Sequence, residues 1–151
     1  MSRDKKNNSK YKIKDSAGEI KPCVLCNPKK YLKFSFAFVS YESSEPKQQD
    51  LVKMWERMRF LSSDTYENMI FTYRTDKQRW FESLEINQIS KSIPSEFRKI
   101  FPSTTNEKYS VMRVYPSGVP NGTANPRIIG MIKHTVFYIF FLDWDGKLYS
   151  H

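Results

Sequence analysis

The spacing of hydrophobic residues predicts strands and helices that begin near residue 30. Residues 30–41 are aromatic and β-branched, and Phe34, Phe36 and Phe38 alternate with small residues, which is typical of a strand with one face in a core. Residues 108–115, 127–133 and 136–142 show similar alternation and predict three more strands. The pair Asp145-Gly146 indicates a tight turn, after which residues 147–149 are predicted to add a final short strand.

Helical spacing appears between the first strand and the later ones. The residues that share one predicted helical stripe are Leu51, Met54, Trp55, Met58 and Leu61. Asp50 is the expected cap of this helix, and Asp64 is the expected cap of a second helix at residues 65–71. Residues 84–86 indicate a short strand and residues 94–100 a short helix.

This element order predicts an α+β fold. The expected sheet is antiparallel and combines the C-terminal three-stranded meander with the N-terminal strand, and the helices are expected to pack on one face. A chain of 151 residues has the length of one domain. We therefore expect a basic, partly disordered arm at residues 1–29, followed by a single domain at residues 30–151.

The positive charge is unevenly distributed. The whole chain has 25 Lys and Arg against 16 Asp and Glu, for a formal charge of +9. Residues 1–33 hold ten basic and three acidic side chains, a net +7, and the remaining residues hold 15 and 13, a net +2. Such an arm can bind phosphate backbones without reading sequence, or can simply be a solubilising tail. The arm residues expected to contact nucleic acid are Arg3, Lys5, Lys6, Lys10, Lys12 and Lys14.

Composition also bears on the compartment. The chain has no apolar run near the ~18 residues of a membrane span, and its N-terminus lacks the apolar stretch of a signal peptide. Two cysteines cannot build a disulfide framework, which fits a reducing cytosol. We therefore expect a cytoplasmic protein with no membrane partner.

The two cysteines form a CxxC motif. Cys23 and Cys26, followed by Asn27, resemble half of a zinc knuckle, since two thiolates at this spacing fit adjacent corners of a tetrahedral site. The chain has no second CxxC to supply the other two ligands. The alternatives are a zinc site completed elsewhere, or two thiols in an anchoring segment with no cofactor.

The chain contains no glycine-rich phosphate loop, HExxH or GxSxG motif. Asp143 and Asp145 flank a predicted turn, where aspartate is common for backbone reasons, although metal or acid–base work is the alternative. A group of basic and aromatic residues on the predicted C-terminal strands could converge on one face of the meander, where it would offer cations, an imidazole and phenols to RNA. Its members are Arg113, Arg127, Lys133, His134, Tyr138 and Tyr149.

The C-terminal blocks carry a family resemblance. Arg127-Ile-Ile-Gly130, then Phe137-Tyr138 through Leu142-Asp143, then Lys147-Leu-Tyr149 resemble a family of small bacterial and mobile-element proteins without an assigned function. The resemblance extends to Lys33-Phe-Ser-Phe36 and to residues 55–63 followed by Thr65. The family pattern favours a histidine near Gly146, and this chain has none there.

The layout is also similar to that of RelE/ParE-type toxins, which place a strand and two helices before an antiparallel meander. This similarity implies that Arg113 and Arg127 stabilise the charge on a scissile phosphate, with His134 or Tyr149 as general acid or base. It would make the chain a toxin of a toxin–antitoxin pair, a ribonuclease acting on mRNA at the ribosome and neutralised by an antitoxin. The alternative is a non-enzymatic module of a phage or mobile element that binds nucleic acid or protein, with the arm supplying phosphate contacts.

Overall fold

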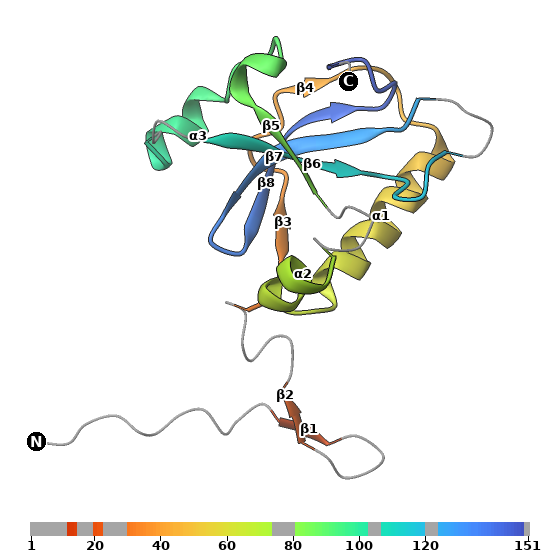
Figure 1. The fold of residues 1–151 in the computed structure, drawn as a ribbon, viewed down its shortest axis with the longest axis vertical. Coiled ribbons are helices and arrows are strands. Elements are labelled where there is room, and N and C mark those ends of the chain that lie inside the picture. The colour runs from red at the N-terminus through yellow and green to blue at the C-terminus, as the bar shows by residue number, and fades with distance from the viewer. Residues whose placement is uncertain are drawn as a thin grey trace, which may run out of the picture.

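The computed structural model describes residues 30–69, 81–102, 107–119 and 124–149, together with the backbone of residues 12–14, 20–22 and 70–73 (Figure 1). The helices are α1 (Gln48–Ser62), α2 (Tyr66–Tyr73), the short 3-10 helix η2 (Ile86–Gln88) and α3 (Ser95–Ile100). The strands are β1 (Lys12–Lys14), β2 (Ile20–Pro22), β3 (Lys33–Ser35), β4 (Tyr41–Glu42), β5 (Glu82–Glu85), β6 (Lys108–Arg113), β7 (Arg127–Lys133) and β8 (Val136–Asp143).

One mixed, mostly antiparallel sheet organises the domain. Its strand order is β3-β8-β7-β6-β5, and β4 pairs with β8 on the same side as β3. The meander β6-β7-β8 is antiparallel, which confirms the predicted α+β class and the C-terminal meander. The N-terminal strand differs from the expectation because β3 and β4 run parallel to β8. The first and last strands of the domain are therefore neighbours.

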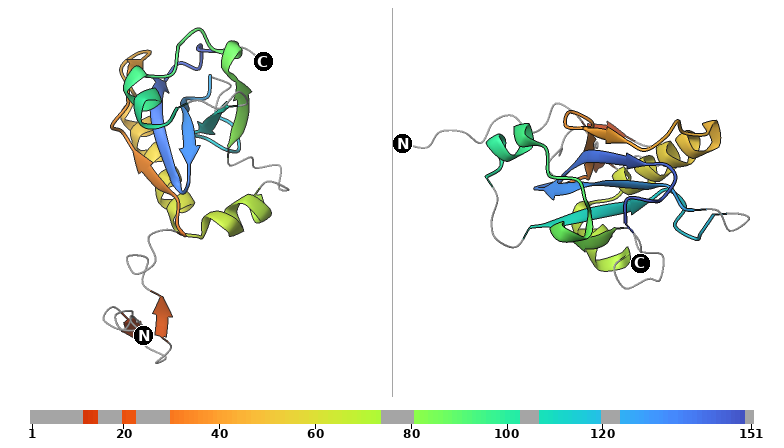
Figure 2. Two further views of the ribbon diagram at one scale, coloured as in Figure 1. Left: turned by 90° about the vertical axis from the view of Figure 1, so that its left-hand side faces the viewer. Right: turned by 90° about the horizontal axis from the view of Figure 1, so that it is seen from above.

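The sheet has a hydrophobic core on each face. One core lies under α1 and α2 and includes Met58, Leu61 and Met69 with Ile128 and Phe137 of the sheet. The other includes Phe97 of α3 together with strand residues that alternate with those of the first core. The two longer helices thus share a face as predicted, but α3 covers the opposite face, and the strands lie between α1 and α3 in Figure 1 and in the right-hand view of Figure 2.

The predicted first strand is interrupted. Phe34 pairs with Phe137 and Tyr41 with Phe141, so seven steps along the N-terminal segment cover only four along β8. Residues 36–40 leave the ladder and return through a hydrogen bond from the Ser40 N–H to the Phe140 carbonyl, at 2.9 Å. The extra residues expose Phe36, which the alternation had placed in the core.

The buried side of α1 is narrower than predicted. Met58 and Leu61 are buried and Met54 packs against the same core, but Leu51 and Trp55 are exposed. Asp50 is not the cap, because α1 begins at Gln48 and the Asp50 carboxylate accepts a hydrogen bond from the Tyr115 hydroxyl at 2.8 Å. These parts of the helix prediction were wrong because contact with the sheet, not helical spacing alone, decides which residues are covered.

The predicted cap of α2 and the last predicted strand also need correction. Thr65, not Asp64, caps α2, with its hydroxyl accepting the Asn68 N–H at 3.2 Å. Residues 147–149 do not form a strand; the chain turns after β8 and Tyr149 packs into the core. Asp143, the last residue of β8, holds that turn because its carboxylate accepts the backbone N–H groups of Lys147 and Leu148.

The N-terminal arm contains a feature that was not predicted. Strands β1 and β2 pair antiparallel, with Ile13 opposite Lys21, and form a two-stranded sheet separate from the main one. Most of the arm, including Arg3, Lys5, Lys6 and Lys10, lies outside the described residues. No helix in the described segments has the length and hydrophobicity needed to cross a membrane.

Candidate functional site

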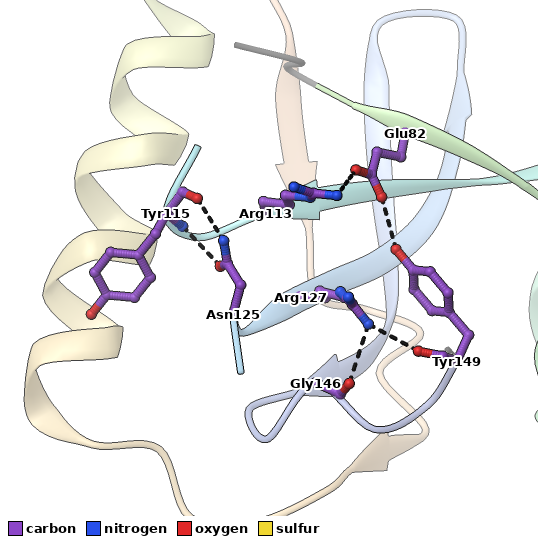
Figure 3. A network of polar contacts seen from close by, with 7 residues as sticks. All are labelled: Glu82, Arg113, Tyr115, Asn125, Arg127, Gly146 and Tyr149. Atoms are coloured by element: carbon purple, nitrogen blue, oxygen red, sulfur yellow. Dashed lines mark hydrogen bonds and ion pairs between the residues drawn. The ribbon is translucent and has the colours of Figure 1, made fainter. Parts of the chain in front are cut away.

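Three of the predicted site residues meet at one end of the meander. Arg113 closes β6 and Arg127 opens β7, and the two are register partners in the antiparallel pair. The chain after β8 returns to the same place and brings Tyr149 beside them (Figure 3). The backbone pairing therefore positions both guanidinium groups, and the turn at residues 143–146 positions the phenol.

Glu82 of β5 connects two of these groups. Its carboxylate forms an ion pair with Arg113 and accepts a hydrogen bond from the Tyr149 hydroxyl at 2.9 Å. Glu82 and Tyr149 are only 8% and 6% exposed. Burial, followed by the hydrogen bond to Glu82, raises the pKa of Tyr149 well above its ordinary value. The phenol therefore stays protonated near neutral pH and cannot serve as a general base there.

Arg127 fixes the C-terminal turn to the sheet. Its guanidinium donates to the carbonyl oxygens of Gly146 at 3.2 Å and Tyr149 at 3.0 Å. The same group lies over the Tyr149 ring, 4.3 Å from its centroid, in a cation–π contact. Figure 3 shows these bonds directed at the protein's own backbone. Both bonds come from Nη1, so this atom holds the C-terminal turn against the sheet.

His134 is not part of this group. It lies in the β7–β8 turn, seven residues from Arg127 along β7, which corresponds to about 23 Å of extended strand. Its backbone is left-handed, with φ of 56°, and its side chain is exposed. The predicted convergence of His134 with Arg127 on one catalytic face was therefore wrong, because the histidine marks the opposite end of the strand.

Lys133 and Tyr138 belong to the same end as His134. Lys133 forms an ion pair with Glu107, and Tyr138 is half-buried in an aromatic cluster on the α3 face. The Tyr138 ring lies 5.3 Å from Phe101 and 5.7 Å from Phe38, between centroids. The partly buried rings of this cluster include Phe38, Phe101 and Tyr138, and the exposed Arg98 and Lys99 of α3 precede Phe101 in the chain. Rings beside cations suit nucleobases and phosphates.

The carboxylates at the turn have a backbone role. Asp143 is fully buried, and its two oxygens accept the N–H groups of Lys147 at 3.0 Å and Leu148 at 3.1 Å. Burial raises the pKa of Asp143, whereas the pKa of Asp145 is lowered, chiefly by a hydrogen bond with Ser43. Asp145 also pairs with Lys147 at 3.2 Å. These contacts account for both aspartates as turn residues.

A cavity of about 420 Å³ lies between the start of α1 and the C-terminal turn. Tyr115 and Trp144 contribute aromatic surface to it, and Asp50 and Asp145 contribute carboxylates. Burial and the hydrogen bond to Asp50 raise the pKa of Tyr115 to about 12. The Asn125 side chain holds the backbone of Tyr115: it accepts a hydrogen bond from the Tyr115 N–H at 3.2 Å and donates one to the Tyr115 carbonyl at 2.6 Å (Figure 3).

Glu82 and Asn125 were not among the predicted site residues. The available signal for Glu82 was alternation, because it stands at a position of β5 where burial recurs every second residue. A carboxylate at such a position requires a partner, and Arg113 and Tyr149 supply it. Asn125 gave no comparable signal, since it lies in a loop rich in turn-forming residues.

The predicted zinc ligands Cys23 and Cys26 lie outside the described residues. Within the described segments, no three His, Cys, Asp or Glu side chains group in a way that could hold a metal ion.

In comparisons with known proteins, no family model, curated protein or solved structure matches the chain. The class defined by the fold and this site is an α+β domain with a closed polar network at one end of its meander and an aromatic surface at the other.

Proposed function

We propose that the chain is a cytosolic protein that binds single-stranded RNA without cleaving it. The basic N-terminal arm supplies phosphate contacts, and the aromatic surface around Tyr138 supplies ring contacts to bases. The observation that carries this proposal is the separation of charge between residues 1–33, at +7, and the rest of the chain, at +2.

The ion pairs within the domain support the assignment of the phosphate contacts to the arm. Among the described residues of the domain, the ion pairs with its own carboxylates include those of Lys53, Lys108, Arg113, Lys133 and Lys147. Ion-paired cations attract a polyanion weakly, because a neighbouring carboxylate repels the phosphate that approaches them. The unbalanced cations of the arm are therefore the main electrostatic contribution to affinity.

The arrangement of the predicted catalytic residues favours binding over cleavage. Arg113 and Tyr149 both contact Glu82, and Arg127 contacts the Tyr149 ring and the backbone. His134 lies at the other end of β7. A phosphate-cleaving site needs an acid or base within hydrogen-bond reach of the cations that stabilise the transition state. These four residues do not meet that requirement together.

The test compares two sets of three lysines in the full chain. Lys10, Lys12 and Lys14 are changed to Gln in the arm, and Lys53, Lys108 and Lys147 are changed to Gln in the domain as a charge-matched control. Affinity for a 20-nucleotide oligouridine is measured by fluorescence anisotropy across a salt series. The arm variant should lose about 2 units of the slope of log affinity against log salt, since each single-strand phosphate contact contributes about 0.7.

The control variant should keep nearly the whole slope, because its lysines are already paired with carboxylates. Equal losses in the two variants would place the phosphate contacts on the domain and contradict the proposal. Oligouridine that binds as tightly at high salt as at low salt would contradict it as well.

Ribonuclease activity is the second candidate function. The observation that favours it is an open depression beside the polar network, lined by Arg127, Lys147 and Tyr149. Asn87, Gln88 and Ser90 form its other side and could hydrogen-bond a nucleotide. The RNA recovered from the binding experiment, and mRNA incubated with ribosomes and the protein, should remain intact if the first proposal holds. Discrete RNA fragments would contradict binding without cleavage and support ribonuclease activity.

A further inference from the structure

An exposed apolar stripe runs along the solvent side of α1. It consists of Leu51, Val52 and Trp55, which are 41%, 51% and 60% exposed. These residues are three or four positions apart or adjacent, so they form one continuous patch on the helix surface. Arg59 follows Trp55 by one helical turn and extends the patch, while Met58 and Leu61 hold the adjoining side of α1 in the core.

Both acidic and basic side chains border this stripe. Lys53 and Glu56 pair with each other at 2.7 Å, so neither is available to a partner without breaking that contact. Lys47 precedes the stripe and Arg59 ends it, and within the described part of the chain neither side chain pairs with a carboxylate. Arg59 is thus the cation that directly adjoins the apolar residues, while Lys47 lies at the N-terminal end of α1, where it also lines the cavity with Asp50.

We propose that this stripe of α1 is a docking surface for an acidic, amphipathic helix of a partner protein. Lys47 and Arg59 are twelve residues apart, or about 18 Å at the rise of an α-helix. A partner helix of about three turns, with apolar residues in its middle and a carboxylate near each end, matches that length and charge. Trp and Arg are also the residue types that most often dominate the binding energy of protein interfaces.

Other occupants fit the patch less well. A second copy of the chain would bring the same cationic ends and the same charge of +9 to the contact. Single-stranded RNA gains stacking energy from aromatic faces, and two of the three apolar residues are aliphatic. A membrane surface favours a broad apolar face on a basic helix, whereas on α1 the Glu56 side chain lies one turn from both Val52 and Phe60 and interrupts the exposed apolar residues.

The experiment selects helical peptides from an acidic display library against the full chain. Each selected peptide is then measured by fluorescence titration against wild type and against the Trp55→Ser, Arg59→Glu and Ile100→Ser variants. Ile100 is 61% exposed on α3, so Ile100→Ser is a matched control that removes an equally exposed apolar side chain elsewhere. The circular dichroism spectra of all variants are compared first.

Selected peptides should carry carboxylates at both ends of an apolar stripe. Trp55→Ser should weaken them about 30-fold, in the range of an interface hot spot, and Ile100→Ser should leave them unchanged. Arg59→Glu should weaken them about tenfold and improve binding of the same peptides with lysine at one end. Failure to enrich any peptide, or affinities insensitive to Trp55, would overturn the proposal.

Two further measurements separate the competing occupants. Sedimentation with phosphatidylserine–phosphatidylcholine vesicles that is lost on Trp55→Ser would assign the stripe to a membrane and overturn the proposal. A loss of oligouridine affinity on Trp55→Ser comparable to the loss of peptide affinity would assign it to RNA, with the same consequence. Retained oligouridine binding with lost peptide binding supports the partner-protein surface independently of the proposed RNA function.

Discussion

The guanidinium of Arg127 and the phenol of Tyr149 direct their hydrogen bonds to other atoms of the same domain. Arg127 joins the C-terminal turn to β7, and Tyr149 joins it to Glu82 of β5, 67 residues away in the chain. Because Tyr149 and Glu82 are buried, losing one of them leaves a polar atom of the other without water or protein to replace its partner. The contribution of these hydrogen bonds can therefore be measured as a change in the free energy of unfolding.

At the scale of these residues, we predict that Tyr149→Phe lowers the free energy of unfolding by about 1–3 kcal/mol, since Glu82 loses a hydrogen bond in a buried site. Tyr138→Phe is the control, because the Tyr138 hydroxyl makes no hydrogen bond within the described residues, and it should change stability by less than about 0.5 kcal/mol. Urea denaturation followed by tryptophan fluorescence measures both. Unchanged stability of Tyr149→Phe would indicate a functional, not structural, phenol.

A second prediction at this scale concerns alkaline pH. Burial raises the pKa of Tyr109 to about 12, and its hydroxyl donates to the Lys91 carbonyl at 2.9 Å. Between the ordinary tyrosine pKa of about 10 and this value, the unfolded chain loses the proton that the folded chain keeps. Stability is thus fully retained below pH 10 and falls as pH rises toward 12, by up to about 1.4 kcal/mol per pH unit from this residue.

The variant Tyr109→Phe isolates that contribution. Its free energy of unfolding should fall less steeply than that of wild type between pH 10 and pH 11.5, after both are referenced to their values at pH 8. Urea midpoints across the pH series provide the measurement. Parallel curves for the two proteins would show that Tyr109 ionises equally in the folded and unfolded chains.

Strand β7 shows how one residue can set the geometry of an element. The β7–β8 pairing shifts between Ile129 and Gly130, and this bulge brings the backbone of Tyr138 against Gly130. A Cβ at position 130 would lie 1.9 Å from the Tyr138 carbonyl oxygen. The two central strands of the sheet therefore depend on a position without a side chain.

At the element scale, we predict that Gly130→Ala destabilises the domain by about 3 kcal/mol or more, because backbone atoms of β8 must move. Gly118→Ala is the comparison: its φ of +93° is strained for alanine, but no atom lies within 4 Å of the added Cβ. It should cost about 1 kcal/mol. Thermal unfolding of both variants tests the difference, and equal destabilisation would argue against close packing at Gly130.

Across the whole molecule, the excess positive charge and the exposed apolar stripe lie in different parts of the chain. The charge that gives the chain its +9 is concentrated in residues 1–33, whereas the exposed apolar stripe lies on α1 of the nearly neutral domain. The domain itself is held together by the pairing of its first strands with its last, β3 and β4 beside β8. The two proposed binding activities therefore use separate surfaces and can be removed separately.

The sequence alone determined the local elements of this protein and the partition of its charge. Strand β7 and helix α3 were predicted nearly residue for residue, because alternation, turn residues and proline act over a few neighbouring positions. The contribution of Asp143 to a turn was likewise visible, since short side chains there bond the nearby backbone.

Only the tertiary structure decided which predicted residues meet. The parallel direction of β3, the exposure of Trp55 and the contact of Glu82 with Tyr149 all depend on segments far apart in the chain. Local patterns cannot specify such partners, because burial of a side chain is a property of whatever packs against it. For the same reason the sequence grouped His134 with Arg127, and the length of β7 separates them.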